Sequence, residues 1–274
     1  MIELKPNDYG RVRPLFAEMA AVHVSIGSVL DGYSPGFVYV DDGDTPSLAF
    51  LSSPEGAHLI GTPTNPDWRE DVAAFVQDTL LDERGWSDVY VIIGDNLDGL
   101  KHCFPMFDAF QIMLRYYYTC TELAFDWRAN LPAGYEVRRL DADLLTDPAI
   151  THGNGRSGWK HICEWMIMGW SSMACFLEHG FGFVTLHDNA VVSYSLADGR
   201  SGDECEIGIH TVPDYRQHGL AALTTAAAVE YALANNYRLV GWHCDQQNDG
   251  SWHTAERVGF VRAQNYGMNR VCNR

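Results

Sequence analysis

The sequence predicts an α+β protein in two halves, each of which combines hairpin-linked strands with helices. Short segments of alternating apolar and polar residues are separated by turns rich in Asp, Gly and Pro. Segments in which apolar residues recur at helical spacing lie between them. The polar, turn-rich stretch at 126–134 separates the two halves. We therefore expect an α/β N-terminal domain over 1–130 and a second domain over 131–274.

The N-terminal half has its clearest helical pattern at 68–81, where apolar residues from Val72 to Leu80 share one side. The segment 89–93 is a continuous apolar run, which is typical of a buried strand. The expected strands of this half cover 37–40, 47–51, 57–60, 89–93 and 111–119.

The C-terminal half predicts a longer series of strands and helices. A Trp- and Met-rich helical region covers 159–177, and an alanine-rich helix covers 220–234. Asn235 and Asn236 end that helix, because asparagine tolerates a left-handed backbone. A last helix ends at Val258, before Gly259. The expected strands cover 135–140, 182–186, 191–196, 204–212 and 239–244, with one more from 260.

The net charge, the apolar segments and the cysteines limit which binding partners and cellular location we expect. The 274 residues carry 19 basic and 36 acidic side chains, a net charge of -17, without a compensating basic block. This charge disfavours nucleic acid and anionic membranes as partners and favours a cationic small molecule, unless the acidity only aids solubility. The chain shows no apolar leader or membrane-length run, and its seven cysteines are scattered. We expect a cytoplasmic protein without a disulfide framework or a metal.

The most informative stretch joins a strand to a helix at 204–234. Pro213 ends the strand because proline lacks an N–H group. Arg216 to Gly219 then precede the first helical turn, whose N–H groups have no partner inside the helix. Gly219 lets a ligand approach the backbone, and the small Ala221 and Ala222 keep the next turn open. This arrangement predicts a pyrophosphate cradle, against the alternative of an ordinary loop.

The motifs of this region resemble the GNAT (Gcn5-related N-acetyltransferase) superfamily. Arg216-Gln-His-Gly219-Leu-Ala221 is similar to its coenzyme A loop. Downstream, Trp242-His-Cys-Asp-Gln-Gln-Asn248-Asp-Gly-Ser251 and Gly259-Phe260 are similar to its strand, asparagine, helix and Gly-Phe. The combination is most similar to the group that includes the zwittermicin A resistance acetyltransferase. The specific match covers about residues 204 to 260.

The resemblance implies a GNAT fold in the C-terminal half, a mixed and mostly antiparallel sheet flanked by helices. It also implies acetyl-CoA as co-substrate and transfer of the acetyl group to a primary amine of a small, cationic molecule by direct attack. A larger acyl group is the weaker alternative. The residues expected at coenzyme A are Thr211, Val212, Arg216, Gln217, His218, Gly219, Leu220, Ala221, Ala222, Asn248 and Ser251.

Catalysis requires a base for the amine and a donor for the oxyanion. Alternation places Glu204, Glu206, Gly208 and His210 on one strand face, with Cys205, Ile207 and Ile209 toward the core. The family commonly uses a strand glutamate here, so Glu206 is the first candidate base and His210 the second. The alternative is that Glu206 is a solvated edge charge. The oxyanion donor is expected to be a backbone N–H near Thr211 or Val212.

The sequence departs from the family at the expected general acid. Many members carry a tyrosine seven residues after the asparagine, and this position is Ala255. The possible substitutes for this general acid are Ser251, His253, Tyr266 and water. Of these, we take Ser251 as the catalytic candidate. The missing phenol leaves open a non-catalytic coenzyme A-binding sensor or scaffold.

Three tryptophans and a set of His and Cys residues could each serve function or only core packing. Trp159, Trp165 and Trp170 are candidates for lining the acceptor pocket, although their helical spacing also suits core packing. His161, Cys163, Cys175 and His179 do not have the spacing of a standard zinc site.

The N-terminal half has an element order that suits a degenerate GNAT-like copy. Its loop at 61–66 contains two prolines where a cradle would need N–H donors. We expect it to bind no coenzyme A, and to wall the acceptor cleft or support the other half. The loop Asp41-Asp-Gly-Asp44 lacks the spacing of a calcium-binding loop and is expected to be a turn.

Overall fold

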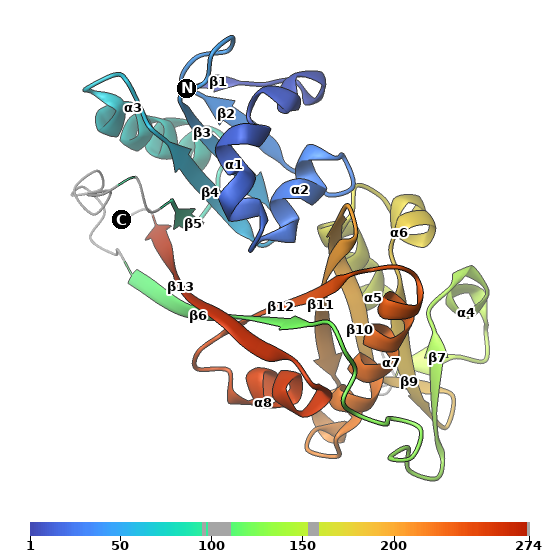
Figure 1. Cartoon of the computed structure of the whole chain (residues 1–274). Helices are drawn as coiled ribbons and strands as arrows, with labels where there is room; N and C mark the ends of the chain where they lie inside the picture. The colour runs from blue at the N-terminus through green and yellow to red at the C-terminus, as the bar shows by residue number, and fades with distance from the viewer. Residues whose placement is uncertain (95–96, 98–110, 153–158, 273–274) are drawn as a thin grey trace. The chain divides into compact units, whose positions relative to one another are not determined.

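A computed structural model describes residues 1–94, 97, 111–152 and 159–272 (Figure 1). The chain divides into two compact units. Unit 1 contains Met1–Arg115 and Asn265–Arg274, and unit 2 contains Tyr116–Gln264. The division at 115/116 lies 15 residues before the boundary predicted at 130/131. The last residues of the chain, Asn265–Arg274, belong to unit 1 and not to unit 2. The assignment of domains over 1–130 and 131–274 stays a proposal.

Unit 1 is built on a mixed sheet with strand order β1-β2-β3-β4-β5-β13. The pairs β1/β2, β2/β3, β3/β4 and β5/β13 are antiparallel, whereas β4/β5 is parallel. The strands that the sequence predicted at 37–40, 47–51, 57–60 and 89–93 are confirmed. The strands are β1 (Ile2–Glu3), β2 (Phe37–Val40), β3 (Leu48–Ser53), β4 (Gly56–Gly61), β5 (Asp88–Ile93) and the end of β13 (Val261–Cys272).

Helices cover both faces of this sheet. Ala49 and Leu51 of β3 pack into one core with Phe16, while Leu48 and Phe50 pack into another with Leu80. Successive strand residues point to opposite faces, so a strand covered on both sides is apolar throughout. The helices are η1 (Pro6–Arg11), α1 (Arg13–Ala20), α2 (Val24–Leu30) and α3 (Trp68–Ala74), which continues as a π-helix over Phe75–Glu83. Of these helices, η1, α1 and α2 were not predicted from the sequence.

The turn after β2 is held by carboxylates, as expected of a turn. Asp41 Oδ1 accepts hydrogen bonds from the N–H groups of Ser47 and Leu48, each at 2.9 Å. Asp42 Oδ1 accepts from the N–H groups of Asp44 and Thr45, each at 2.8 Å.

Unit 2 contains the strand order β6-β12-β11-β10-β9-β7, with β8 paired to β10. The β11/β10, β10/β9 and β9/β7 pairs are antiparallel, and β11/β12 is parallel. The expected mixed, mostly antiparallel sheet is therefore present. The strands are β6 (Gln111–Cys120), β7 (Tyr135–Arg139), β8 (Thr151–His152), β9 (Gly182–His187), β10 (Ala190–Ser201), β11 (Glu204–Thr211) and β12 (Leu239–Asp245).

α-Helices accompany this sheet in unit 2. Helix α7 (Leu220–Ala234) has the predicted bounds and is buried along most of its length. Helix α8 (Asp249–Val258) ends at Gly259, whose φ of 117° is left-handed. The others are α4 (Ala142–Thr146), α5 (Trp159–Gly169) and α6 (Met173–His179). The helical region predicted over 159–177 is confirmed and consists of two helices, because Ser172 caps α6 by accepting a hydrogen bond from Cys175 N–H at 3.0 Å.

Candidate active site

The site forms where β11 separates from β12. The pairing of β11 with β12 ends at Glu206, opposite Gly241. The pairing of β11 with β10 continues to Thr211. The Val212 N–H donates to Val192 O at 2.9 Å, on the β10 side. Backbone groups of successive strand residues point to opposite edges, so the Thr211 N–H points to the β12 side. Of the two donors expected for an oxyanion, Val212 is therefore wrong, and Thr211 has the suitable direction.

The loop after β11 presents the N-terminus of α7. Pro213–Tyr215 form one 3-10 turn, and Gln217 and Gly219 have positive φ angles of 63° and 77°. Gly219 is the N-cap residue and offers no capping side chain. Leu223 N–H bonds back to Gly219 O at 3.3 Å, whereas the N–H groups of the residues before it have no acceptor inside the helix. The sequence-predicted cradle is thus a helix N-terminus with open donors.

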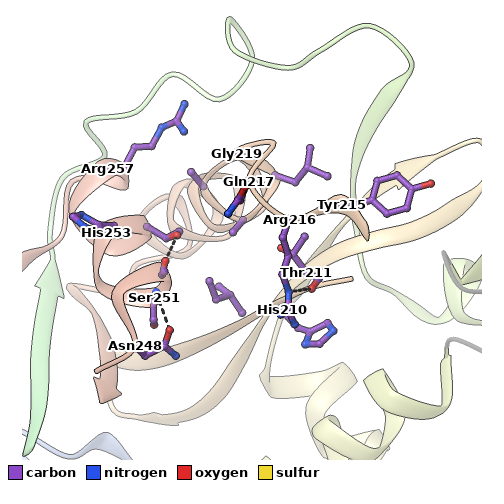
Figure 2. Close-up of a pocket in the computed structure, with 16 residues that line it drawn as sticks. His210, Thr211, Tyr215, Arg216, Gln217, Gly219, Asn248, Ser251, His253 and Arg257 are labelled. Carbon is purple, nitrogen blue, oxygen red and sulfur yellow. Dashed lines mark hydrogen bonds between the residues drawn. The ribbon is translucent and has the colours of Figure 1, made fainter. Parts of the chain in front are cut away.

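A cavity of about 710 Å³ lies beside this helix end (Figure 2). Its walls come from the end of β11, from the loop and first turn of α7, and from one face of α8. The lining residues are Ile209, His210, Thr211, Tyr215, Arg216, Gln217, Gly219, Leu220, Ala221, Ala222, Asn248, Gly250, Ser251, His253, Thr254 and Arg257.

Most of the residues expected at coenzyme A line this one cavity. Two do not: Val212 is 1% exposed in the core, and His218 is exposed but not part of the cavity wall. Val212 follows the last residue of β11 and its side chain is buried, whereas Thr211, the last residue of the strand, is half-buried and lines the cavity. Ile209, expected in the core, is half-buried and lines the cavity instead.

Arg257 lies beside the cradle and was not among the residues predicted from the sequence. A Cβ on Gly219 would come 3.1 Å from Arg257 Nη1. The second arginine, Arg216, donates from Nε to Thr211 O at 3.1 Å. Two guanidinium groups and the positive end of a helix dipole thus meet in a strongly acidic chain. The available signal was the helical spacing of Gly250, His253, Thr254 and Arg257 on one face of α8.

Residues at the start of α8 form another wall of the cavity. Asn248 Oδ1 caps the helix by accepting from Ser251 N–H at 3.2 Å. Ser251 Oγ accepts from the Trp242 indole N–H at 3.1 Å, which leaves the serine proton available for another acceptor. Ala255 is 0% exposed and does not line the cavity. A group that reaches the cavity from α8 therefore comes from Ser251, His253 or Thr254, not from position 255.

Glu206 is buried, so the alternative of a solvated edge charge is wrong. It is 4% exposed, and its Oε1 lies 3.1 Å from His243 Nε2 on β12. The His243 ring stacks on Tyr117 of β6, with centroids 4.6 Å apart. Cys205 and Ile207 point into the core as expected. Glu206 does not line the 710 Å³ cavity.

His210 joins the cavity to a second polar cluster. Its ring stacks on Tyr194 at 5.2 Å and lies 4.9 Å from His161 of α5, which hydrogen-bonds to the Tyr194 hydroxyl. Trp165 Nε1 donates to Asp198 Oδ1 at 2.5 Å. A Cβ on Gly208 would come 2.5 Å from both Asp198 Oδ2 and the Trp165 ring, so the glycine makes room for this pair.

The three candidate acceptor tryptophans differ in position. Trp165 belongs to the cluster around Asp198, and Trp159 is half-buried at the start of α5. Trp170 is 1% exposed and donates to Ala197 O at 2.7 Å. Its indole is a core group, and we omit it from the acceptor site. In the part of the chain that the structure describes, no group of three or more His, Cys, Asp or Glu side chains is placed to hold a metal. None of the helices described there is long and apolar enough to cross a membrane.

The opened sheet and the helix-terminus cavity define a transferase of the GNAT fold. The model of the GNAT acetyltransferase family matches residues 13–268, and the chain belongs to this family of N-acetyltransferases. A relative from Bacillus subtilis (strain 168), the uncharacterized N-acetyltransferase YdfB, is 26% identical over 265 residues, which is 96% of each protein.

Solved structures show the same fold. A GCN5-related N-acetyltransferase-like protein from Streptococcus suis is 21% identical with a TM-score of 0.66, covering 97% of this chain and 99% of its own. A tandem GNAT protein from the clavulanic acid biosynthesis pathway is 14% identical with a TM-score of 0.64, covering 99% and 97%. This second likeness fits the two-half arrangement. The matches do not test the similarity to the zwittermicin A resistance group, which stays a prediction.

Proposed function

We propose that this protein transfers the acetyl group of acetyl-CoA to a primary amine of a small, cationic molecule. The observation that carries the proposal is the cavity at the N-terminus of α7, where open N–H donors lie between Arg216 and Arg257. Such a helix end suits a pyrophosphate. The volume of about 710 Å³ is in the range of cofactor sites.

The remaining length of coenzyme A fits the edge of β11. The pantetheine arm would follow Ile209 to Thr211, where backbone groups of β11 point toward β12 beyond its recorded pairing. The Thr211 N–H would then stabilise the developing oxyanion. Ser251, whose hydroxyl proton is available, is the proposed donor to the departing thiolate.

The acceptor is proposed to bind on the face that carries Glu206 and Asp198. Asp198, Trp165 and Tyr194 combine a carboxylate with aromatic rings, a pairing that suits an ammonium group. The net charge of -17 favours the approach of a cation. Glu206 is the proposed base, because an amine must lose its ammonium proton before it can attack.

The proposed reaction is a direct transfer. The neutral amine attacks the thioester carbon, a C–N bond forms, and the tetrahedral intermediate collapses as the C–S bond breaks. One proton leaves the ammonium toward Glu206 before the attack. The second leaves the new amide nitrogen and replaces the proton that Ser251 gives to the thiolate.

Release of free thiol from acetyl-CoA, measured across a panel of mono- and polyamines, tests the proposal. We expect turnover with cationic amines and little with neutral ones. Glu206→Gln should lower the rate by about 10²–10⁴-fold, with partial recovery at high pH, while acetyl-CoA affinity is retained.

A large loss in His210→Ala with a normal rate in Glu206→Gln would assign the base role to His210. Tight acetyl-CoA binding without thiol release from any amine would favour a binding module.

A further inference from the structure

Three buried polar side chains meet on one face of neighbouring strands of unit 2, outside the cavity. Glu206 lies on β11, His243 on β12 and Tyr117 on β6, and these strands are adjacent in the sheet. Gly241, opposite Glu206 in register, leaves the space between them open. A Cβ there would come 3.0 Å from Glu206 Cγ and 3.3 Å from Tyr117 Cε2.

Burial makes the contact between Glu206 and His243 important. Their side chains are each 5% exposed, and Nε2 and Oε1 lie 3.1 Å apart. A buried carboxylate is costly unless hydrogen bonds compensate for its lost hydration. When His243 is neutral with its proton on Nε2, it donates to the ionised carboxylate and fixes its direction.

Tyr117 adds a second observation. It is 4% exposed, and its hydroxyl is buried without a hydrogen-bond partner among the residues that the structure describes. Burial, and then the charge of Glu206, raise the pKa of this hydroxyl, so it stays a neutral donor. A buried donor without a protein acceptor points to a bound water or a polar ligand atom.

We propose that His243 is a positioning residue for the base, and that Tyr117 binds a water that carries the acceptor's proton to Glu206. This inference rests on the proposed base role of Glu206. The water gives one proton to a Glu206 oxygen and takes one from the ammonium group, so it is regenerated and the amine becomes neutral. The relay explains how a carboxylate that does not line the cavity acts on a substrate beside it.

Other charged groups near Glu206 could also affect the pH dependence of the rate. Glu204, on the same strand face, pairs with Arg238. Arg238 also reaches Asp203, with Nε 3.3 Å from Oδ2. At Gly208, a Cβ would come 2.5 Å from Asp198 Oδ2, and His210 follows two residues later on β11. All of them remain unchanged in the variants below, so a change in the pH profile reports on His243 or Tyr117.

The test compares His243→Phe with His243→Gln. Phenylalanine keeps the ring that stacks on Tyr117 but removes the donor, whereas glutamine keeps an N–H donor. We expect His243→Phe to lose at least about tenfold in kcat, part of the range for a general base. The acidic limb of its rate profile should move to higher pH, because a carboxylate without its donor is protonated more readily. His243→Gln should keep most of the wild-type rate and profile.

A double variant covers the case in which His243→Phe does not fold. Glu206→Gln/His243→Phe holds no unpaired charge, and its rate should equal that of Glu206→Gln alone if His243 acts only through the carboxylate. Tyr117→Phe should lower kcat with an unchanged KM for acetyl-CoA.

Two results would overturn the relay while the base role stands. One is a wild-type profile in His243→Phe, and the other is a double variant much slower than Glu206→Gln. A wild-type rate in Tyr117→Phe would remove the water from the relay. A wild-type rate in Glu206→Gln would instead refute the base role itself.

Discussion

Arg257 lies against Gly219, so that a Cβ on the glycine would come 3.1 Å from its Nη1. The contact joins α8 to the N-terminus of α7, two elements separated by β12 in the chain. It places a guanidinium group beside the open N–H groups of the helix, where an anion is favoured. Arg257 lies outside the coenzyme A loop motif, yet it adds a second positive charge to the cavity beside that of Arg216.

Replacing Arg257 tests its part in binding. Arg257→Gln should weaken acetyl-CoA by about 1–2 kcal/mol, because an exposed charge-assisted contact with phosphate is lost. Calorimetry at low and high salt would measure this, and the difference should shrink as salt screens the charge. Arg262→Gln is the matched control, since Arg262 stacks on Tyr116 and does not line the cavity. Equal affinity in the two variants would contradict the role.

Gly219→Asp should weaken acetyl-CoA by at least about 1–3 kcal/mol. The φ of 77° strains a side chain, and the new carboxylate would repel the pyrophosphate and attract Arg257. Gly202→Asp is the control: it has a φ of 56° and open space around its Cβ direction, away from the cavity. If calorimetry finds the two variants equally affected, strain explains the loss and the cradle assignment fails.

Ser251 and Ala255 should respond in different ways. Ser251→Ala should reduce thiol release by less than about tenfold, since the thiolate of coenzyme A, with a pKa near that of cysteine at about 8.5, is a tolerable leaving group. Ala255→Tyr should lower the melting temperature instead of raising the rate, because a fully buried methyl group leaves no room for a phenol. A faster and equally stable Ala255→Tyr enzyme would show that the helix can turn this position toward the cavity.

Asp41 should make unit 1 sensitive to acid. Hydrogen bonds from the Ser47 hydroxyl and from the N–H groups of Leu48, Ser47 and Asp42 lower its pKa, although burial, the largest single cause, acts in the opposite direction. A carboxyl whose pKa is lower in the folded state stabilises fully above its unfolded pKa, near 3.8, and loses this contribution as pH falls through the folded value.

Asp41→Asn should therefore reduce the unfolding free energy by about 1–3 kcal/mol at pH 7, and by less below pH 3.8. Denaturant titrations at pH 7 and pH 3 measure the difference. Asp44→Asn, whose side chain is 97% exposed on the same turn, is the control. A gap that is equal at both pH values would exclude the carboxylate as its cause.

Several features followed from the sequence because they depend on neighbouring residues. Helix α7 has its predicted bounds, and Gly219 and Gly259 take the left-handed backbone that suits glycine at a helix terminus. Period-two alternation on β11 separated Glu206 from Cys205, and the structure places Cys205 in the core as expected. The α1 and α2 helices escaped detection because they are short, with eight and seven residues, and α2 is buried all round.

The strand–loop–helix that presents open N–H donors could be predicted from the residues alone, since backbone direction and helix ends are local properties. The tertiary structure alone decided what surrounds them. It brought Arg257 to Gly219, turned the Val212 N–H group toward β10, and buried Glu206 beside His243, whose ring stacks on Tyr117. These contacts join residues far apart in the chain, and only the pairing of strands and the packing of helices determine which of them meet.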